Sequence, residues 1–275
     1  MHNQRYPQID RQTIDTYQTD GVVLLKGAFT AWIDGLANGV AELMANPSEY
    51  GHARTVVPKD GSAPFFQDYC NWSRIADFEQ FVRQSPAAEI AAALMQSTTA
   101  KFFHEHTLVK PAGGSTVTPW HHDQPYYCVE GRQNVSFWIP LDPVAQEISL
   151  RCIRGSHLWG EEFSPTRFNG SKLYQHGRFK ELPDIDAHQE EYDIVSWALE
   201  PGDAIAFHYR TLHGARGNAT ARARRVFSAR WVGDDATFVD RGGVTSPPFP
   251  ELTLKEGDAL VSPLFPQVWL REARG

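Results

Sequence analysis

The sequence has little cysteine, no long apolar run and no excess of positive charge. Its 275 residues include three cysteines, Cys70, Cys128 and Cys152, which lie far apart and form no CxxC pair. A disulfide framework is therefore not expected, and the pattern fits a reducing compartment. No window reaches the roughly 18 consecutive apolar residues of a membrane span, and the polar N-terminus lacks the apolar segment of a secretory signal. We expect a cytoplasmic protein with no membrane partner.

The formal net charge is −7, and the densest basic cluster is the short arginine group at residues 222–225. This argues against a nucleic-acid partner, whose binding needs a basic patch or stripe. Repeats, low-complexity tracts and Gly/Ser linkers are also lacking, so a single domain is expected over residues 1–275. The expected partner is a small-molecule substrate, and these features leave the oligomeric state open.

The chain changes character near residue 100. Up to about residue 99 it predicts helices near residues 10–17, 30–46 and 86–97, and a buried strand at 22–29. From about 100 to 235, short β-rich runs recur between turn residues, at 102–109, 134–141, 147–153, 203–208 and 225–232. The polar stretch at about 160–197 reads as an insertion or lid. The pattern predicts a mainly β fold, a sandwich, jelly roll or barrel, with flanking α-helices.

Residues 118–127, TPWHHDQPYY, place two histidines and an aspartate in a β-rich setting. On an extended strand, side chains two residues apart project to the same face. We therefore expect His121 and Asp123 to point together and His122 to point the opposite way. An imidazole and a carboxylate at this spacing can share one metal ion, and a second imidazole would complete the two-histidine, one-carboxylate set of non-haem iron(II) oxygenases.

The second histidine has two candidates in residues 206–218, AFHYRTLHGARGN. His213 is favoured because the glycine after it lets the backbone pass close to a bound ligand. His208 ends an apolar run, which is more typical of a packed strand residue. His104 and His106 also stand two residues apart, but strand histidines of this kind are more often packed or surface residues.

A cluster of arginines follows in residues 224–232, RRVFSARWV. Arg224, Ser228 and Arg230 share one face of the expected strand. A buried arginine beside an iron site suits a dicarboxylate, because its guanidinium donates two hydrogen bonds to one carboxylate. This points to 2-oxoglutarate as a co-substrate. Strand alternation does not choose between Arg224 and Arg230 for this role.

With these residues assembled, the chain resembles the phytanoyl-CoA dioxygenase family of iron(II)- and 2-oxoglutarate-dependent oxygenases. The similarity spans about residues 20–240, and its motifs stand in a specific order. They are WHHDQPYY (120–127), NVSFWIPLD (134–142), RGSHLWG (154–160), EPGDAIAFH (200–208), LHGARGN (212–218) and RRVFSARWVGDD (224–235).

The resemblance implies a double-stranded β-helix, the cupin-like jelly roll, that uses iron(II), 2-oxoglutarate and O2. It implies that His121, Asp123 and His213 hold the iron. It also implies that Arg224, and not Arg230, binds the far carboxylate of 2-oxoglutarate, in a pocket lined by Trp138. We expect Ser228, on the same face as Arg224, to contact this co-substrate too.

The sequence departs from the family between the first two iron ligands, where His122 replaces the usual glutamine. Asp123 itself is present, whereas related halogenases have a small residue there that leaves an iron position for chloride. The resemblance therefore implies hydroxylation and not halogenation.

Tyr126 and Tyr127 are expected to line the substrate cavity, and His122 to lie near it. Ring faces attract cations, and a spare arginine suits an anion, so a small zwitterion such as an aminoalkylphosphonate or an amino-acid-like compound is the favoured substrate of this hydroxylase. An acyl-CoA or another acyl thioester is the alternative. Alternatives of another class are a metal-binding cupin-type enzyme that uses no 2-oxoglutarate, and an inactive binding protein.

Overall fold

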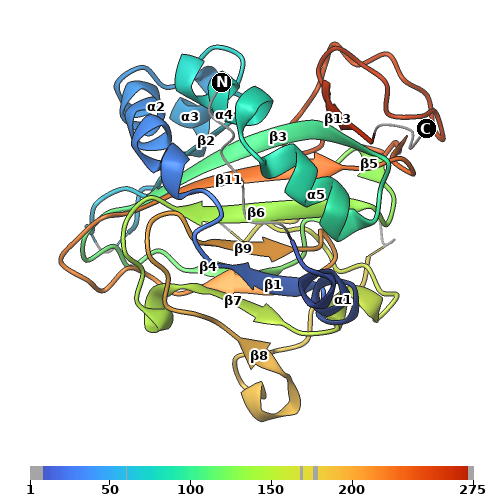
Figure 1. The fold of residues 1–275 in the computed structure, drawn as a ribbon. Coiled ribbons are helices and arrows are strands. Elements are labelled where there is room, and N and C mark those ends of the chain that lie inside the picture. Colours follow the sequence, from blue (N-terminus) through green and yellow to red (C-terminus); the bar gives the residue numbers. More distant parts are fainter. Residues whose placement is uncertain (1–8, 60, 168–169, 176–178, 272–275) are drawn as a thin grey trace.

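Two antiparallel β-sheets form the centre of the molecule, and helices cover the larger one (Figure 1). The structure, a computed structural model, describes residues 9–59, 61–167, 170–175 and 179–271. The large sheet runs in the order β1-β9-β6-β11-β3-β13, with β2 also paired to β3. Its strands are β1 (Val22–Leu25), β2 (Phe66–Tyr69), β3 (Thr99–Lys110), β6 (Asn134–Pro140), β9 (Ala204–Phe207), β11 (Arg224–Val232) and β13 (Gln267–Leu270).

The small sheet has four strands in the order β4-β10-β7-β8. They are β4 (Thr118–His121), β7 (Leu150–Ile153), β8 (Ile194–Val195) and β10 (His213–Ala215). A separate pair consists of β5 (Val129–Glu130) and β12 (Thr237–Phe238). Neighbours within each sheet are distant in sequence, as expected when a chain winds back and forth between two facing sheets. The predicted jelly roll with flanking helices is confirmed.

Among the described residues, five α-helices precede or alternate with the first strands of the chain. They are α1 (Arg11–Asp20), α2 (Ile33–Ala45), α3 (Glu49–Arg54), α4 (Ala76–Gln84) and α5 (Ala87–Met95). The helix expected near residue 10 begins where the side chain of Asp10 accepts a hydrogen bond from the Thr13 amide at 2.7 Å, and it ends at Gly21 in the left-handed conformation. The helices α3 and α4 were not expected from the sequence.

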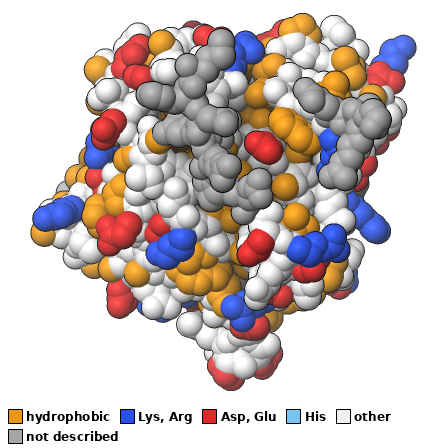
Figure 2. All heavy atoms as spheres, viewed as in Figure 1, with side chains coloured by type: hydrophobic (Ala, Val, Ile, Leu, Met, Phe, Trp, Pro, Cys, Tyr) orange, Lys and Arg blue, Asp and Glu red, His pale blue; other side chains and the backbone are white. Residues whose placement is uncertain are grey.

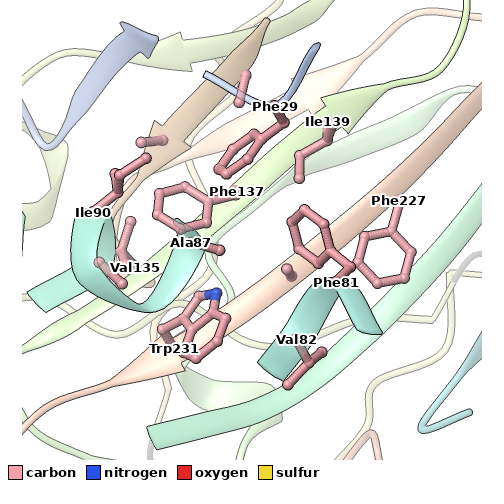
Figure 3. Close-up of a cluster of buried hydrophobic side chains, with 14 of the residues drawn as sticks. Phe29, Phe81, Val82, Ala87, Ile90, Val135, Phe137, Ile139, Phe227 and Trp231 are labelled. Atoms are coloured by element: carbon pink, nitrogen blue, oxygen red, sulfur yellow. The ribbon is translucent and has the colours of Figure 1, made fainter. Parts of the chain in front are cut away.

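Strand alternation gives the central strands of the large sheet two different faces. One face carries Val135 and Phe137 of β6 with Phe227 and Trp231 of β11, all buried against the helices. Figure 3 shows these side chains meeting Phe81 of α4, together with Val82, Ala87 and Ile90. The alternate residues of the same strands therefore project to the other side of the sheet, into the space between the two sheets.

The segment expected as an insertion, about 160–197, contains few regular elements among its described residues. Besides β8 it has the 3-10 turn at Gln189–Glu191. It is nevertheless attached to the small sheet, because Phe163 and Ile185 are buried together with Trp120 of β4, and the indole Nε1 of Trp120 donates to Asp186 at 3.1 Å. The segment packs on the outside of the strand that ends at His121.

Charged side chains of both signs are dispersed over the face of the molecule shown in Figure 2, without a continuous patch of either sign. Within the part of the chain that the structure describes, none of the helices combines the length and apolarity needed to cross a bilayer.

Replacing Phe227 with Ala should lower the free energy of unfolding by about 3–5 kcal/mol. The ring lies 4.6 Å from Phe78 and 5.4 Å from Phe81, centroid to centroid, so its loss leaves a cavity under α4. Urea denaturation measures the change. The control is Val244→Ala at an exposed position, which should change stability by less than about 0.5 kcal/mol. Equal effects of the two substitutions would contradict the assigned core.

Candidate metal centre

The pairing of β4 with β10 brings two distant histidines together. His213 stands opposite His121 in the register of the two strands, and their ring centroids are 4.2 Å apart. Gly214 makes this approach possible, since a Cβ there would meet the carbonyl oxygen of Thr118 in β4 at 3.1 Å. Gly214 was expected to let the backbone pass close to a bound ligand, but what it allows is the close approach of β10 to β4.

Backbone carbonyls orient both imidazole rings. The Nδ1 of His121 lies 2.8 Å from the carbonyl oxygen of Pro119, and the Nδ1 of His213 lies 2.9 Å from that of Thr211. A carbonyl oxygen only accepts, so each Nδ1 carries the proton and each Nε2 keeps a free lone pair. These Nε2 atoms lie 3.6 Å and 3.8 Å from the same oxygen, Oδ1 of Asp123.

Asp123 lies close to the two histidines as predicted, but the backbone conformation that places it there is not the predicted strand. The strand β4 ends at His121, and Asp123 has helical dihedral angles (φ −72°, ψ −34°) just before the 3-10 turn η2 (Gln124–Tyr126). Strand alternation therefore does not explain why the two side chains converge. The turn that begins after His121 directs the carboxylate inward, and one potential ligand atom from each of the three residues lies within 4.8 Å of the others.

The second oxygen of Asp123 is held from the large sheet. Its Oδ2 lies 3.4 Å from Nε of Arg230 and accepts a hydrogen bond from the hydroxyl of Ser136 at 3.3 Å. Arg230 of β11 and Ser136 of β6 stand opposite each other in the strand register. Asp123 thus presents one oxygen to the histidines and the other to a buried arginine.

Electrostatics keep Asp123 and His213 in the protonation states that a metal needs. Burial alone would raise the pKa of Asp123, but Arg230 and the two histidines outweigh burial and hold that pKa well below its usual range. Burial, reinforced by His121, lowers the pKa of His213 to about 3. At neutral pH the site therefore offers a carboxylate and a neutral imidazole, the forms that bind divalent metals.

A cavity between the two sheets opens beside these three residues. Its empty volume, counted together with the open solvent at its mouth, is about 1190 Å³. Strands of both sheets line it, and so does the segment after residue 160. Its polar and aromatic lining includes Gln67, Tyr69, His104, His106, Tyr126, Tyr127, Trp138, Arg167, Arg224, Ser228 and Arg230.

Arg224 and its neighbours give one end of this cavity the features of an anion site. The guanidinium is buried, donates to the carbonyl of Ile148, and lies 5.5 Å from the ring centroid of Trp138. Within the described structure, its Nε and the buried hydroxyl of Ser228 have no hydrogen-bond partner. Unpaired buried donors facing a cavity are costly unless a ligand satisfies them. A dicarboxylate such as 2-oxoglutarate fits this donor set.

Of the two roles considered for Arg230, contact with an anionic substrate or an ion pair, the structure shows an ion pair, and its partner is Asp123. Its Nε donates a hydrogen bond to the hydroxyl of Tyr127 and lies beside Asp123, so this arginine already has partners and is not available to bind a substrate anion. Tyr127 lines the cavity, but its hydroxyl accepts the hydrogen bond from Arg230. Strand alternation placed Arg230 on the correct face; its non-local partner had no signal in the sequence.

His122 lies between two residues that line the cavity and has its own partner, and Tyr126 has an additional contact. The Nε2 of His122 accepts a hydrogen bond from the Phe163 amide at 2.9 Å, and His122 is not one of the described residues that line the cavity. It holds the segment after residue 160 rather than a substrate. Tyr126 lines the cavity, and its hydroxyl donates to the carbonyl of Thr166 at 2.7 Å and accepts from the same residue's amide at 2.9 Å.

His208 has no ring nitrogen available for a metal. Its Nδ1 accepts a hydrogen bond from the Arg210 amide at 3.0 Å, and its Nε2 lies 3.1 Å from the carbonyl oxygen of Arg132. His104 and His106 line the cavity without approaching the three candidate ligands as a fourth member of the group. Arg167, which the sequence did not single out, lines the cavity at its solvent end.

The fold and the donor set define a non-haem iron oxygenase: two imidazoles and one carboxylate on one side of a cavity in a jelly roll. Residues 17–226 match the model of the Phytanoyl-CoA dioxygenase (PhyH) family, and the chain belongs to this family. The family consists of iron(II)- and 2-oxoglutarate-dependent dioxygenases, so the predicted enzyme class and its cofactors, iron(II), 2-oxoglutarate and O2, are confirmed at the level of the family.

Individual relatives are distant. A "Probable phytanoyl-CoA dioxygenase" of Caenorhabditis elegans is 22% identical over 202 residues, which cover 70% of this chain and 59% of that protein, less than two thirds of its length. Among solved structures, the carbocyclase SnoK from nogalamycin biosynthesis is 19% identical with a TM-score of 0.74, covering 95% of this chain and 97% of that one. EctD from S. alaskensis, with 2-oxoglutarate and 5-hydroxyectoine, is 19% identical with a TM-score of 0.69, covering 100% and 90%. At these identities the structures share the fold.

Replacing His213 with Ala should weaken iron(II) binding by more than about 100-fold, since loss of an outer partner alone typically costs 10–100-fold. The matched control is His208→Gln, the other histidine of the same segment, which should bind the metal as the wild type does. Calorimetry under anaerobic conditions measures both affinities. The ligand assignment is wrong if the two variants exchange these results.

Proposed function

We propose that this chain hydroxylates a C–H bond of a small organic metabolite, with iron(II) held by His121, Asp123 and His213. The observation that carries this proposal is the convergence of the three donors on a cavity that also contains Arg224, a buried cation without a carboxylate partner among the described residues. The carboxylate–keto half of 2-oxoglutarate would bind at the metal, and its far carboxylate would bind at Arg224, over Trp138 and beside Ser228.

When bound, iron(II) supplies the oxidising chemistry of the overall reaction, in which substrate, 2-oxoglutarate and O2 give hydroxylated substrate, succinate and CO2. The protein's own groups bind and orient. Arg224 orients the co-substrate along β11, and Arg230 holds Asp123 with one oxygen free. The sheets and the segment after residue 160 limit the access of water to the buried part of the cavity.

Asp123 also favours hydroxylation over halogenation. A halide would need the position that this carboxylate fills, and two buried donors, Arg230 and Ser136, fix the carboxylate in place. Halogenated product from the purified enzyme would contradict this part of the proposal.

The charges that line the cavity favour a substrate with an anionic group. Asp123 is the one carboxylate among the described lining residues, whereas Arg167 and Arg224 both face the cavity. Arg224 serves 2-oxoglutarate, so Arg167 at the solvent end is the remaining cation for the substrate. An ammonium group would have ring faces such as Tyr69 and Tyr126 for partners. A small zwitterion, such as an aminoalkylphosphonate or an amino-acid-like compound, agrees with this lining.

The other functions considered make different demands. An acyl-CoA would place the phosphates of its coenzyme A at the cavity mouth and its acyl chain inside. A cupin-type enzyme without 2-oxoglutarate would leave Arg224 without a ligand, and an inactive binding protein would not keep three converging donors. We also propose that the protein works in the cytoplasm, on the basis of its cysteine usage and the lack of a membrane-spanning helix among the described residues.

Substrate-dependent succinate formation tests the proposed reaction. The enzyme with iron(II), ascorbate, 2-oxoglutarate and O2 is screened against phosphonates, amino acids and acyl thioesters, and product mass is recorded. We expect succinate together with a product that has gained one oxygen atom, and no succinate from Asp123→Ala. Near-normal turnover by that variant would refute the ligand assignment. Product without succinate would favour a reaction independent of 2-oxoglutarate.

Replacing Arg167 with Gln should raise KM for the substrate about ten-fold or more, because a hydrogen bond to a charged group typically contributes about 1.5–3 kcal/mol. The affinity for 2-oxoglutarate should not change, since Arg224 binds it at the other end. The matched control is Arg222→Gln, an exposed arginine outside the cavity lining. The same KM in both variants would show that Arg167 does not bind the substrate.

A further inference from the structure

Lys110, the last residue of β3, is a buried cation that the proposed reaction does not use. Its residue surface is 1% exposed. The ammonium Nζ donates to the carbonyl oxygens of Arg216 at 3.0 Å and Ala215 at 3.4 Å, and lies 5.4 Å from the ring centroid of Phe65. Ala215 and Phe65 both line the cavity. Lys110 therefore lies directly behind the part of the cavity wall that Ala215 and Phe65 form.

Arg224 stands opposite Lys110 in the register of β11 and β3. Two buried cations thus face each other on adjacent strands. In the part of the chain that the structure describes, neither forms an ion pair with a carboxylate. Buried charges are normally paired, because removing an ion from water costs several kcal/mol that an opposite charge must offset. A missing counter-charge at the wall of a ligand cavity points to the ligand as its source.

Without that counter-charge, one of the two cations gives up its proton. Burial, and after it the charge of Arg224, lowers the pKa of Lys110 to about 6. Burial lowers the pKa of Arg224 only to about 10, so the arginine stays charged. Arg224 is the one charged side chain that acts on Lys110 among the described residues of the packed strands. Near pH 7 the empty site therefore holds one positive charge at this end.

We propose that Lys110 and Arg224 form a paired receptor for the far carboxylate of 2-oxoglutarate, in which Lys110 takes up a proton from solvent when the co-substrate binds. This inference rests on the proposed function. The amine becomes an ammonium ion, no covalent bond changes, and the second positive charge appears only when an anion is present to stabilise it. Lys110 is a positioning residue. Its charge attracts the far carboxylate and its hydrogen bond holds Ala215 in the cavity wall, but it does not touch the reacting atoms.

Proton uptake on binding tests this inference without turnover. Iron(II)-loaded enzyme is titrated with 2-oxoglutarate under anaerobic conditions, by calorimetry near pH 7 in two buffers of different ionisation enthalpy. The difference in measured heat gives the number of protons exchanged. We expect an uptake approaching one proton per bound molecule, falling toward zero near pH 5, where the lysine is already charged.

Two variants of Lys110 and one alternative ligand distinguish an effect of the lysine charge from an effect on the structure of the site. Lys110→Met should abolish the uptake and weaken 2-oxoglutarate binding about ten-fold, whereas Lys110→Arg, charged at all these pH values, should abolish the uptake and keep most of the affinity. In the wild type, 2-oxobutyrate has the same metal-binding half but no far carboxylate, and it should bind without proton uptake.

The possible results distinguish this inference from the function on which it rests. Binding of 2-oxoglutarate by the wild type without proton uptake, or equal uptake with 2-oxobutyrate, overturns the role of Lys110 and leaves the oxygenase proposal intact. The lack of any 2-oxoglutarate binding overturns both. The ligand comparison needs only wild-type protein, so it decides the matter even if the Lys110→Met chain does not fold.

Discussion

The buried contact between Arg230 and Asp123 is the interaction on which the metal centre depends. A carboxylate enclosed among imidazoles and aromatic rings needs a nearby positive charge to stay ionised, and β11 supplies it from inside the cavity wall. Because Arg230 and Ser136 are opposite each other in the β11–β6 register, both reach the same carboxylate oxygen. A shift of β11 by one residue in this register would turn Arg230 toward the helices and leave Asp123 without its buried cation.

One strand organises the cavity along its length. Arg224, Ser228 and Arg230 project from β11 at strand spacing, so the anion site, an unpaired hydroxyl and the support of the carboxylate follow one another in order. The other face of the same strand carries Phe227 and Trp231 into the helix-covered core. Packing on one side of the sheet thus fixes the positions of the charged groups on the other.

The sequence predicted what depends on periodicity and motif order. It predicted the jelly roll, most strands of the large sheet, and the shared face of Arg224 and Arg230. It could not predict contacts between elements far apart in the chain, such as Arg230 with Asp123. The convergence of His121 and Asp123 was predicted from strand alternation, but a turn produces it. Lys110 shares the alternation of His104 and His106, and that signal could have found it.

The contact between His122 and Phe163 joins the turn that carries Asp123 to the segment after residue 160. His122, between the two donors at 121 and 123, accepts a hydrogen bond from the Phe163 amide. Tyr126, in the turn that follows, forms two hydrogen bonds with the backbone of Thr166. Because the outer segment is held by backbone groups, these contacts fix the course of its chain and not the residue types at positions 163 and 166. A segment of different sequence could therefore be exchanged here without loss of the contacts, provided that its backbone follows the same course.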